Sequence, residues 1–174
     1  MVGGVTEIVT ERLVLRHFVE ADRQAVVEIQ CDPDTNRHNP RPPDTGTTLA
    51  MFDSWLEHWE TYGYGYLAVR EQGRPEAGDG SDVIGMTGVR HREFRGEKVL
   101  NLAYRFRPTA WGKGYAVEAA RAAVEWAERE IPAIPVLISV AVTNTPSLRV
   151  VEKLGFTEYV EEEYDGAVSR HFRR

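Results

Sequence analysis

Trp111-Gly112-Lys113-Gly114-Tyr115-Ala116 joins an apolar run typical of a β-strand to a long alanine-rich segment with helical periodicity. The two glycines carry no Cβ, so the backbone here is able to approach a ligand closely. The start of a helix also presents amide N–H groups that have no partner within the helix. Together these features predict a seat for a phosphate or pyrophosphate group.

The spacing of the glycines excludes two common nucleotide-binding motifs. The dinucleotide fingerprint needs a third glycine near the position that Glu118 occupies. A Walker loop needs Ser or Thr directly after its lysine, whereas Lys113 is followed by Gly114. The segment is therefore predicted to be a pyrophosphate cradle of another kind.

Composition and charge are those of a globular protein with one core. The chain has 174 residues, of which 42% are apolar, and a net charge of -6. This charge argues against a nucleic-acid partner and mildly favours a cationic or amine-bearing one. Because no run of about 18 apolar residues and no signal-peptide pattern is present, we expect no membrane span and a cytoplasmic location. The single cysteine, Cys31, excludes an internal disulfide, and the histidines lack metal-ligand spacing, so no metal site is predicted.

Hydrophobic periodicity predicts one α/β domain over residues 1–174, with residues 1–9 as a loose N-terminal segment. Residues 32–46 are rich in proline and aspartate and predict a long irregular loop, either a binding segment or a mobile surface connection. Helices are predicted after a capping Asp22, over 47–61, from the glycine segment to about 129, and between Pro146 and Gly155. Strands are predicted near 13–18, 64–68, 83–92, 99–106 and 136–142, with a closing hairpin of 156–164 and 167–174.

Three segments resemble signatures of the GNAT superfamily of N-acetyltransferases. Residues 104–119, which read Tyr-Arg-Phe-x4-Trp-Gly-Lys-Gly-Tyr-Ala-Val-Glu-Ala, resemble its acetyl-CoA signature, and residues 144–156 resemble its second signature. Residues 10–16, Thr-Glu-Arg-Leu-Val-Leu-Arg, resemble the opening strand of its ribosomal-protein (RimJ/RimL-like) acetyltransferase branch. The resemblance implies a single GNAT-like domain with a mixed, mostly antiparallel central sheet of about seven strands and about four flanking helices. Two central parallel strands, 99–106 and 136–142, are expected to splay apart and admit the pantetheine arm of the cofactor.

The resemblance also assigns the residues that bind acetyl-CoA, the implied co-substrate. The pantetheine is expected to pair with backbone groups of Arg105, Phe106 and Arg107, as an added strand does. Asn144 and Ser147 are expected at the cofactor, with Ser147 near its sulfur. The amides expected to hold the pyrophosphate are those of Gly112, Lys113, Gly114, Tyr115 and Ala116.

The same resemblance makes Ser147 the candidate general acid for the departing thiolate. A serine at a helix N-terminus is equally typical of a residue that satisfies a backbone amide, and Asn144 shares this ambiguity. The general base is unassigned, because Asn101 stands near the family's usual glutamate and asparagine does not accept a proton. The candidate replacements for this base are Glu97, His91 and Glu162. Each of them is also typical of a solvated surface group.

The implied activity is acetyl-CoA-dependent N-acetylation of a primary amine by direct transfer in a ternary complex. The expected acceptor is a protein N-terminus or a small amine such as a polyamine, an amino acid or an aminoglycoside. We expect the protein to be a monomer or a homodimer. A non-catalytic acyl-CoA-binding or sensing module is an alternative, because Asn101 replaces the glutamate. Transfer of a longer acyl group is a further alternative.

Overall fold

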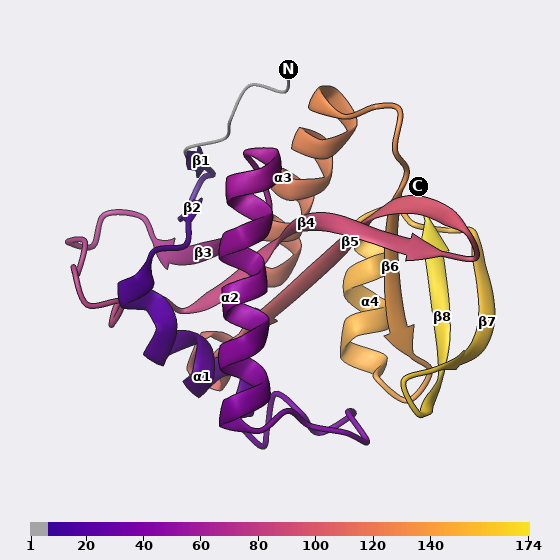
Figure 1. Cartoon of the computed structure of the whole chain (residues 1–174), viewed down its shortest axis with the longest axis horizontal. Helices are drawn as coiled ribbons and strands as arrows, with labels where there is room; N and C mark the ends of the chain where they lie inside the picture. Colours follow the sequence, from indigo (N-terminus) through magenta and orange to yellow (C-terminus); the bar gives the residue numbers. More distant parts are fainter. Residues whose placement is uncertain (1–6) are drawn as a thin grey trace.

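An eight-stranded sheet forms the middle of the structure, in the order β1-β2-β3-β4-β5-β6-β8-β7 (Figure 1). The computed structural model describes residues 7–174. Every neighbouring pair of strands is antiparallel except β5 and β6, which run parallel. The strands are β1 (Glu7–Val9), β2 (Leu13–His17), β3 (Tyr66–Glu71), β4 (Gly85–Phe94), β5 (Glu97–Phe106), β6 (Val136–Ala141), β7 (Tyr159–Tyr164) and β8 (Ala167–Arg173).

Helices cover both faces of the sheet. On one face, α1 and α2 pack on β3, β4 and β5 through an apolar cluster that includes Ile29, Phe52 and Ala68. On the other face, α3 and α4 pack on β5 and β6 through a second cluster that includes Val124, Val151 and Ile138. The helices are α1 (Arg23–Cys31), α2 (Thr45–Tyr62), α3 (Tyr115–Glu130) and α4 (Thr145–Lys153). None of the helices in residues 7–174 has the length and apolarity needed to cross a membrane.

The two parallel strands diverge in the centre of the sheet, as the family resemblance implies. They pair only where Leu100 lies opposite Val136 and Asn101 lies opposite Leu137. Beyond this point β5 stays bonded to β4 on one side, and β6 stays bonded to β8 on the other. The edge of β5 that faces β6 therefore has no partner strand beyond Asn101 in the described structure.

Three local expectations need correction. Residues 7–9 are not loose but form β1 on the edge strand β2, which gives eight strands instead of about seven. Residues 1–6 of the predicted loose segment lie outside the described residues. Asp22 does not cap α1, because its carboxylate accepts hydrogen bonds from Arg16 and from the amide of Val19. The helix after the loop begins at Thr45, since the carboxylate of Asp44 accepts the amide of Thr47.

Candidate active site

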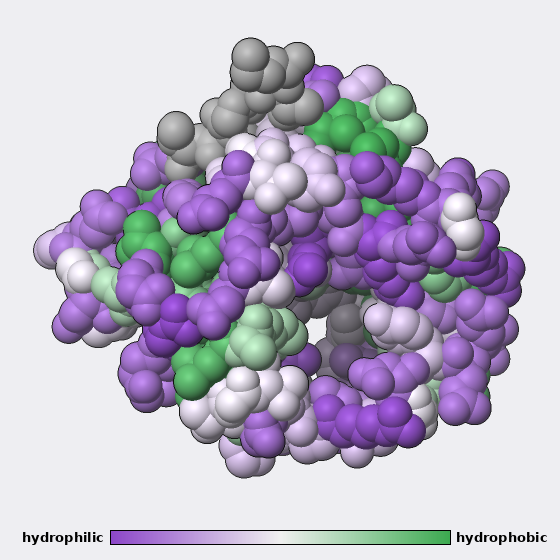
Figure 2. Space-filling model, in the orientation of Figure 1, coloured by the Kyte–Doolittle hydropathy of each residue, from purple (hydrophilic) through white to green (hydrophobic). Residues whose placement is uncertain are grey.

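Two adjoining cavities open at the gap between β5 and β6. One, the α3–α4 cavity, measures about 410 Å³ and lies between the end of β5, the glycine segment and α4. The other, the α2 cavity, measures about 420 Å³ and lies between α2, β4, β5 and β6. Tyr104, Arg105, Asn144 and Ser147 line both. Figure 2 shows this hollow on the surface between α2 and α4.

The glycine segment forms one wall of the α3–α4 cavity. Gly112 has φ 76° and Gly114 has φ 78°, a left-handed backbone that side chains other than glycine rarely adopt. Gly114 is the residue before the first turn of α3, and no side chain caps this end of the helix. The first amides of α3 are therefore available to an anion in the cavity, as expected for a pyrophosphate cradle.

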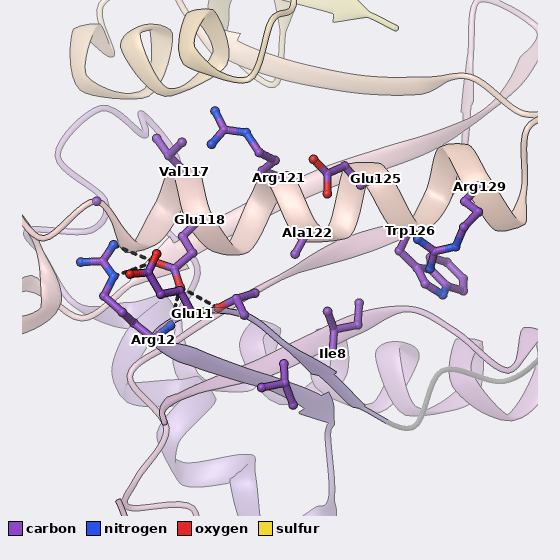
Figure 3. A pocket seen from close by; sticks show the side chains of 13 residues that line it. Ile8, Glu11, Arg12, Val117, Glu118, Arg121, Ala122, Glu125, Trp126 and Arg129 are labelled. Carbon is purple, nitrogen blue, oxygen red and sulfur yellow. Dashed lines mark hydrogen bonds and ion pairs between the residues drawn. The ribbon is translucent and has the colours of Figure 1, made fainter. Parts of the chain in front are cut away.

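Glu118 ties the glycine segment to the start of the chain (Figure 3). Its Oε1 accepts hydrogen bonds from the Thr10 hydroxyl at 2.7 Å and from the Arg12 amide at 2.8 Å. Its Oε2 pairs with the Arg12 guanidinium at 2.7 Å. The same guanidinium donates from Nη1 to the carbonyl of Lys113, also at 2.7 Å. Residues 10–12, 113 and 118 thus form one unit, which we call the loop anchor.

The loop anchor keeps Glu118 ionised. Burial opposes the charge, but the hydrogen bonds from Thr10 and Arg12 outweigh it and lower the pKa of the carboxyl group. Beside the anchor, β1 and α3 enclose a groove of about 530 Å³, lined along α3 by Arg121, Glu125 and Arg129 (Figure 3). Gly114 and Val117 line both this groove and the α3–α4 cavity.

Tyr104 and Ser147 share a short hydrogen bond where the two cavities meet. Their hydroxyl oxygens lie 2.5 Å apart, and the Tyr104 hydroxyl also lies 3.2 Å from the Ser147 carbonyl oxygen. Burial raises the pKa of Tyr104 to about 12, against the opposing hydrogen bond with Ser147. Asn144 performs the helix cap, since its side-chain oxygen accepts the amide of Ser147. The Ser147 hydroxyl is therefore not needed for capping and points to Tyr104 instead.

Arg92 organises the polar wall of the α2 cavity. Its Nη1 donates to Asn101 Oδ1 at 3.0 Å and to Ser139 Oγ at 2.9 Å. Asn101 Nδ2 in turn donates to the Tyr66 hydroxyl at 2.8 Å. Ser139 Oγ lies 2.7 Å from His171 Nδ1, and burial lowers the pKa of His171, so its ring is neutral at neutral pH. One arginine thus holds an amide, a hydroxyl and, through Ser139, a neutral imidazole.

Comparison with known proteins identifies the family. The family model described as "Acetyltransferase (GNAT) domain" matches residues 12–157. The chain belongs to this GNAT acetyltransferase family. The uncharacterised protein YkkB of Bacillus subtilis is 30% identical over 154 residues, which are 86% of this chain and 84% of YkkB. The uncharacterised N-acetyltransferase YnaD of the same organism is 26% identical over 148 residues, 85% of this chain and 81% of YnaD.

Solved structures confirm the fold of this GNAT protein. An acetyltransferase from Agrobacterium tumefaciens superposes with a TM-score of 0.78 at 24% identity, over 100% of this chain and 96% of that one. The ribosomal-protein-S5-alanine acetyltransferase from Vibrio fischeri superposes with a TM-score of 0.67 at 15% identity, over 97% of this chain and 94% of that one. Both superpositions cover nearly the whole of each chain and show a shared fold.

This GNAT protein is an acyltransferase whose co-substrate is acetyl-CoA. The α3–α4 cavity fits the cofactor on the chain's own geometry. It joins an unpaired strand edge, where an extended pantetheine is able to pair, to left-handed glycines and the start of a helix, where a pyrophosphate is able to bind. The sequence therefore predicted the donor correctly.

Most of the predicted cofactor residues line this cavity, but two do not. The backbone of Arg107 donates to the Ile84 carbonyl and its guanidinium pairs with Glu28, so both face away from the gap. The side chain of Lys113 is half exposed near Glu71, and its carbonyl is taken by the loop anchor. The predicted residues that line the α3–α4 cavity are Arg105, Phe106, Gly112, Gly114, Tyr115, Ala116, Asn144 and Ser147.

The replacements considered for the general base lie elsewhere. Glu97 and Glu162 are partly exposed and each forms an ion pair with an arginine. His91, which lies on β4, forms a hydrogen bond with the Tyr64 hydroxyl. None of these three residues lines either cavity. Asn101 does line the α2 cavity, but its amide is held between Arg92 and Tyr66.

Sequence reasoning missed Tyr104 as a site residue, although it opens the quoted signature. It also missed Arg92 and the loop anchor. The available signals were the placement of Arg90 and Arg92 two residues apart on one strand, and the polar pair Thr10 and Arg12 before β2. Neither signal identifies its distant partner without the fold.

Disrupting the loop anchor should weaken acetyl-CoA binding, although Glu118 itself is not expected to contact the cofactor. In Glu118→Ala the Arg12 guanidinium loses its partner and no longer holds the Lys113 carbonyl in place. We expect the Kd for acetyl-CoA, measured by calorimetry, to rise about tenfold, and the unfolding free energy to fall by about 1–3 kcal/mol. Glu125→Ala is the matched control, because Glu125 lies on the same helix and forms no ion pair with any residue in 7–174. If Glu118→Ala and Glu125→Ala bind acetyl-CoA with equal affinity, the loop anchor does not support cofactor binding.

Proposed function

We propose that this enzyme transfers the acetyl group directly from acetyl-CoA to a primary amine while both are bound. The observation that carries the proposal is the junction of the two cavities at Tyr104 and Ser147. A thioester lying in the α3–α4 cavity meets, at this junction, an amine lying in the α2 cavity. The relative YnaD is named an N-acetyltransferase, which also supports nitrogen as the acceptor atom.

The cofactor-binding roles follow from the cavity walls. The amides of Gly114, Tyr115 and Ala116 hold the pyrophosphate, with Gly112 shaping the turn. The unpaired edge of β5 near Arg105 and Phe106 holds the pantetheine as an extra strand. When bound, acetyl-CoA supplies an acetyl thioester. The chain itself places that group at the mouth of the α2 cavity, and this juxtaposition of the reactants is its first contribution to rate.

The chain's second contribution is the proton for the departing thiolate. As the amine nitrogen forms its bond to the carbonyl carbon, the carbon–sulfur bond breaks and the sulfur takes a proton. The amine releases one proton to water, and water returns a proton to the tyrosine, Tyr104, that supplied the thiolate. Because its pKa is about 12, Tyr104 stays protonated at neutral pH and is able to donate. Ser147, in hydrogen-bond contact with Tyr104, passes this proton to the sulfur, which makes the pair the general acid.

An acceptor panel tests the proposed function. The protein is incubated with acetyl-CoA and, one at a time, with amino acids, polyamines, aminoglycosides and peptides, while free thiol release is followed. We expect release that depends on the amine, with an acetyl group added to the amine in the mass spectrum. Binding of acetyl-CoA without amine-dependent release for any class would point to the sensing module. Release with longer acyl-CoA donors alone would point to a different acyl group.

A further inference from the structure

The α2 cavity has an excess of positive charge. Its walls carry three arginines, Arg90, Arg92 and Arg105, and one carboxylate, Asp165. Asp165 is largely exposed and lies 3.8 Å from Arg41. In the part of the chain that the structure describes, neither Arg90 nor Arg92 forms an ion pair. The α2 cavity therefore holds cationic charge with which no carboxylate in residues 7–174 forms an ion pair, although Asp165 lies at its wall.

Arg92 is held in place by neutral groups. Its Nη1 donates to Asn101 and Ser139, and its guanidinium stacks on the Tyr164 ring, 4.4 Å from the ring centre. No described residue accepts a hydrogen bond from its Nε or Nη2. A planar guanidinium fixed by neutral partners, with donors to spare, matches the two oxygens of a carboxylate.

Arg90 extends the same positive surface. It lies two residues before Arg92 on β4 and opposite Asn101 on β5, so the three side chains share one face of the sheet. Its nearest polar contact is a long one, 3.4 Å from Nη1 to Ser54 Oγ, and its guanidinium lies 5.8 Å from the centre of the Tyr66 ring. Arg90 is thus able to turn toward an anion that Arg92 holds.

We propose that the acceptor is a small primary amine that carries a carboxylate, and that Arg92, assisted by Arg90, binds this carboxylate. The proposal rests on the proposed function, since it names the acceptor class of the same site. A polyamine or aminoglycoside would bring additional positive charge beside two unpaired arginines, and like charges repel strongly in a partly buried site. The α-amine of a protein has no adjacent free carboxylate, because that carboxyl group forms the peptide bond.

The acceptor class that the two arginines favour differs from the one that the overall charge indicates. The net charge of -6 favours a cationic partner at long range. Recognition of a bound acceptor depends instead on charges within a few ångströms, because salt screens charges farther than about 8 Å apart at physiological ionic strength. The local excess at Arg90 and Arg92 therefore decides the acceptor class.

Matched acceptors test the proposal. For glycine, methionine and phenylalanine, we compare kcat/KM for the free amino acid, its carboxamide, its decarboxylated amine and a peptide that begins with it. We expect at least one free amino acid to be preferred over its carboxamide by about tenfold or more, which corresponds to about 1.4 kcal/mol. Equal or better activity on the uncharged amines overturns the carboxylate subsite but leaves amine acetylation standing. Preference for the peptides overturns it in favour of a protein N-terminus.

Variants locate the subsite. In Arg92→Met the preference for carboxylate over carboxamide should fall to near unity, and Arg92→Lys should keep part of it. Arg129→Met, which removes the same charge from α3 outside the cavity, should leave the preference unchanged. The ratio of the two acceptors is the readout, because Arg92 also holds Asn101 and Ser139 and its loss lowers absolute rates. An unchanged ratio in Arg92→Met overturns the proposal.

A binding measurement separates this proposal from the proposed function. Calorimetry on the protein saturated with CoA compares N-acetylmethionine with N-acetylmethioninamide, so no turnover is needed. Tighter binding of the carboxylate, lost in Arg92→Met, supports the subsite even if the acceptor panel shows no thiol release. Equal or undetectable binding of both compounds, together with amine-dependent thiol release, overturns the subsite alone.

Discussion

Gly114→Val is expected to abolish measurable acetyl-CoA binding while the protein remains folded. Gly114 has φ 78°, and a β-branched residue is strongly disfavoured there. The space is not the obstacle, because an added Cβ would meet only Arg12 Nη2, at an ordinary 3.5 Å. The strain of about 1–2 kcal/mol or more will instead be relieved by a change of backbone torsion at the first residue before α3. That change turns the amides of Tyr115 and Ala116 away from the pyrophosphate.

The measurement is calorimetry with acetyl-CoA, supported by a thermal melt. We expect the Kd to rise by more than about a hundredfold, since several hydrogen bonds to one charged group are lost together. Gly96→Val is the control, because Gly96 has a similar φ of 77°, an added Cβ there meets nothing within 4 Å, and it lies in the β4–β5 turn. Unchanged affinity in the Gly114 variant would disprove the cradle, whereas unfolding in that variant alone would show that the turn is structural.

The fold and the cofactor side of the site were largely predictable because their signals are local. The glycines, the helix that follows them and the Pro146 helix are each specified within about ten residues, the range over which helical periodicity operates. Even so, the sequence pattern indicated only part of the reason for glycine, namely the close approach of the backbone to a ligand. Left-handed torsions at Gly112 and Gly114, rather than close approach alone, require it.

The acceptor side was not predictable because its contacts join residues far apart in the sequence. Tyr104 meets Ser147 across 43 positions, and Arg92 meets Ser139 across 47. Which strands lie side by side, and where they diverge, decides both contacts. Sequence periodicity places each residue on a face of its own strand but does not pair that strand with a distant one.

Asp22 shows a limit of another kind. Its position before a helix is typical of a cap, but its carboxylate accepts hydrogen bonds from Arg16, on the preceding strand, and from the amide of Val19. A charged partner provides a stronger hydrogen bond than a neutral one does. The capping preference is therefore overridden by an ion pair that residue type and position before a helix do not specify.

Ser147→Ala is expected to lower kcat by about a hundredfold or more while changing the Kd for acetyl-CoA by less than about threefold. The separation is expected because Asn144, not the Ser147 hydroxyl, caps α4, and the capping bond uses the Ser147 amide that alanine retains. What the variant removes is the hydroxyl that lies 2.5 Å from Tyr104, and with it the path for the thiolate's proton.

Tyr104→Phe and the double variant extend this test to the pair. If one proton passes along both hydroxyls, either single loss interrupts the path, and the double variant should be no slower than the slower single variant. If the two hydroxyls act independently, the fold losses in kcat of the two single variants should instead multiply in the double variant. Asn144→Ala serves as the opposite control, because it removes the cap and should lower stability by about 1 kcal/mol while leaving both hydroxyls in the site. Since the pKa of Tyr104 is about 12, the activity of the wild type should show no titration of this tyrosine between about pH 7 and 9, and a tyrosine titrating in that range would exclude it as a protonated donor.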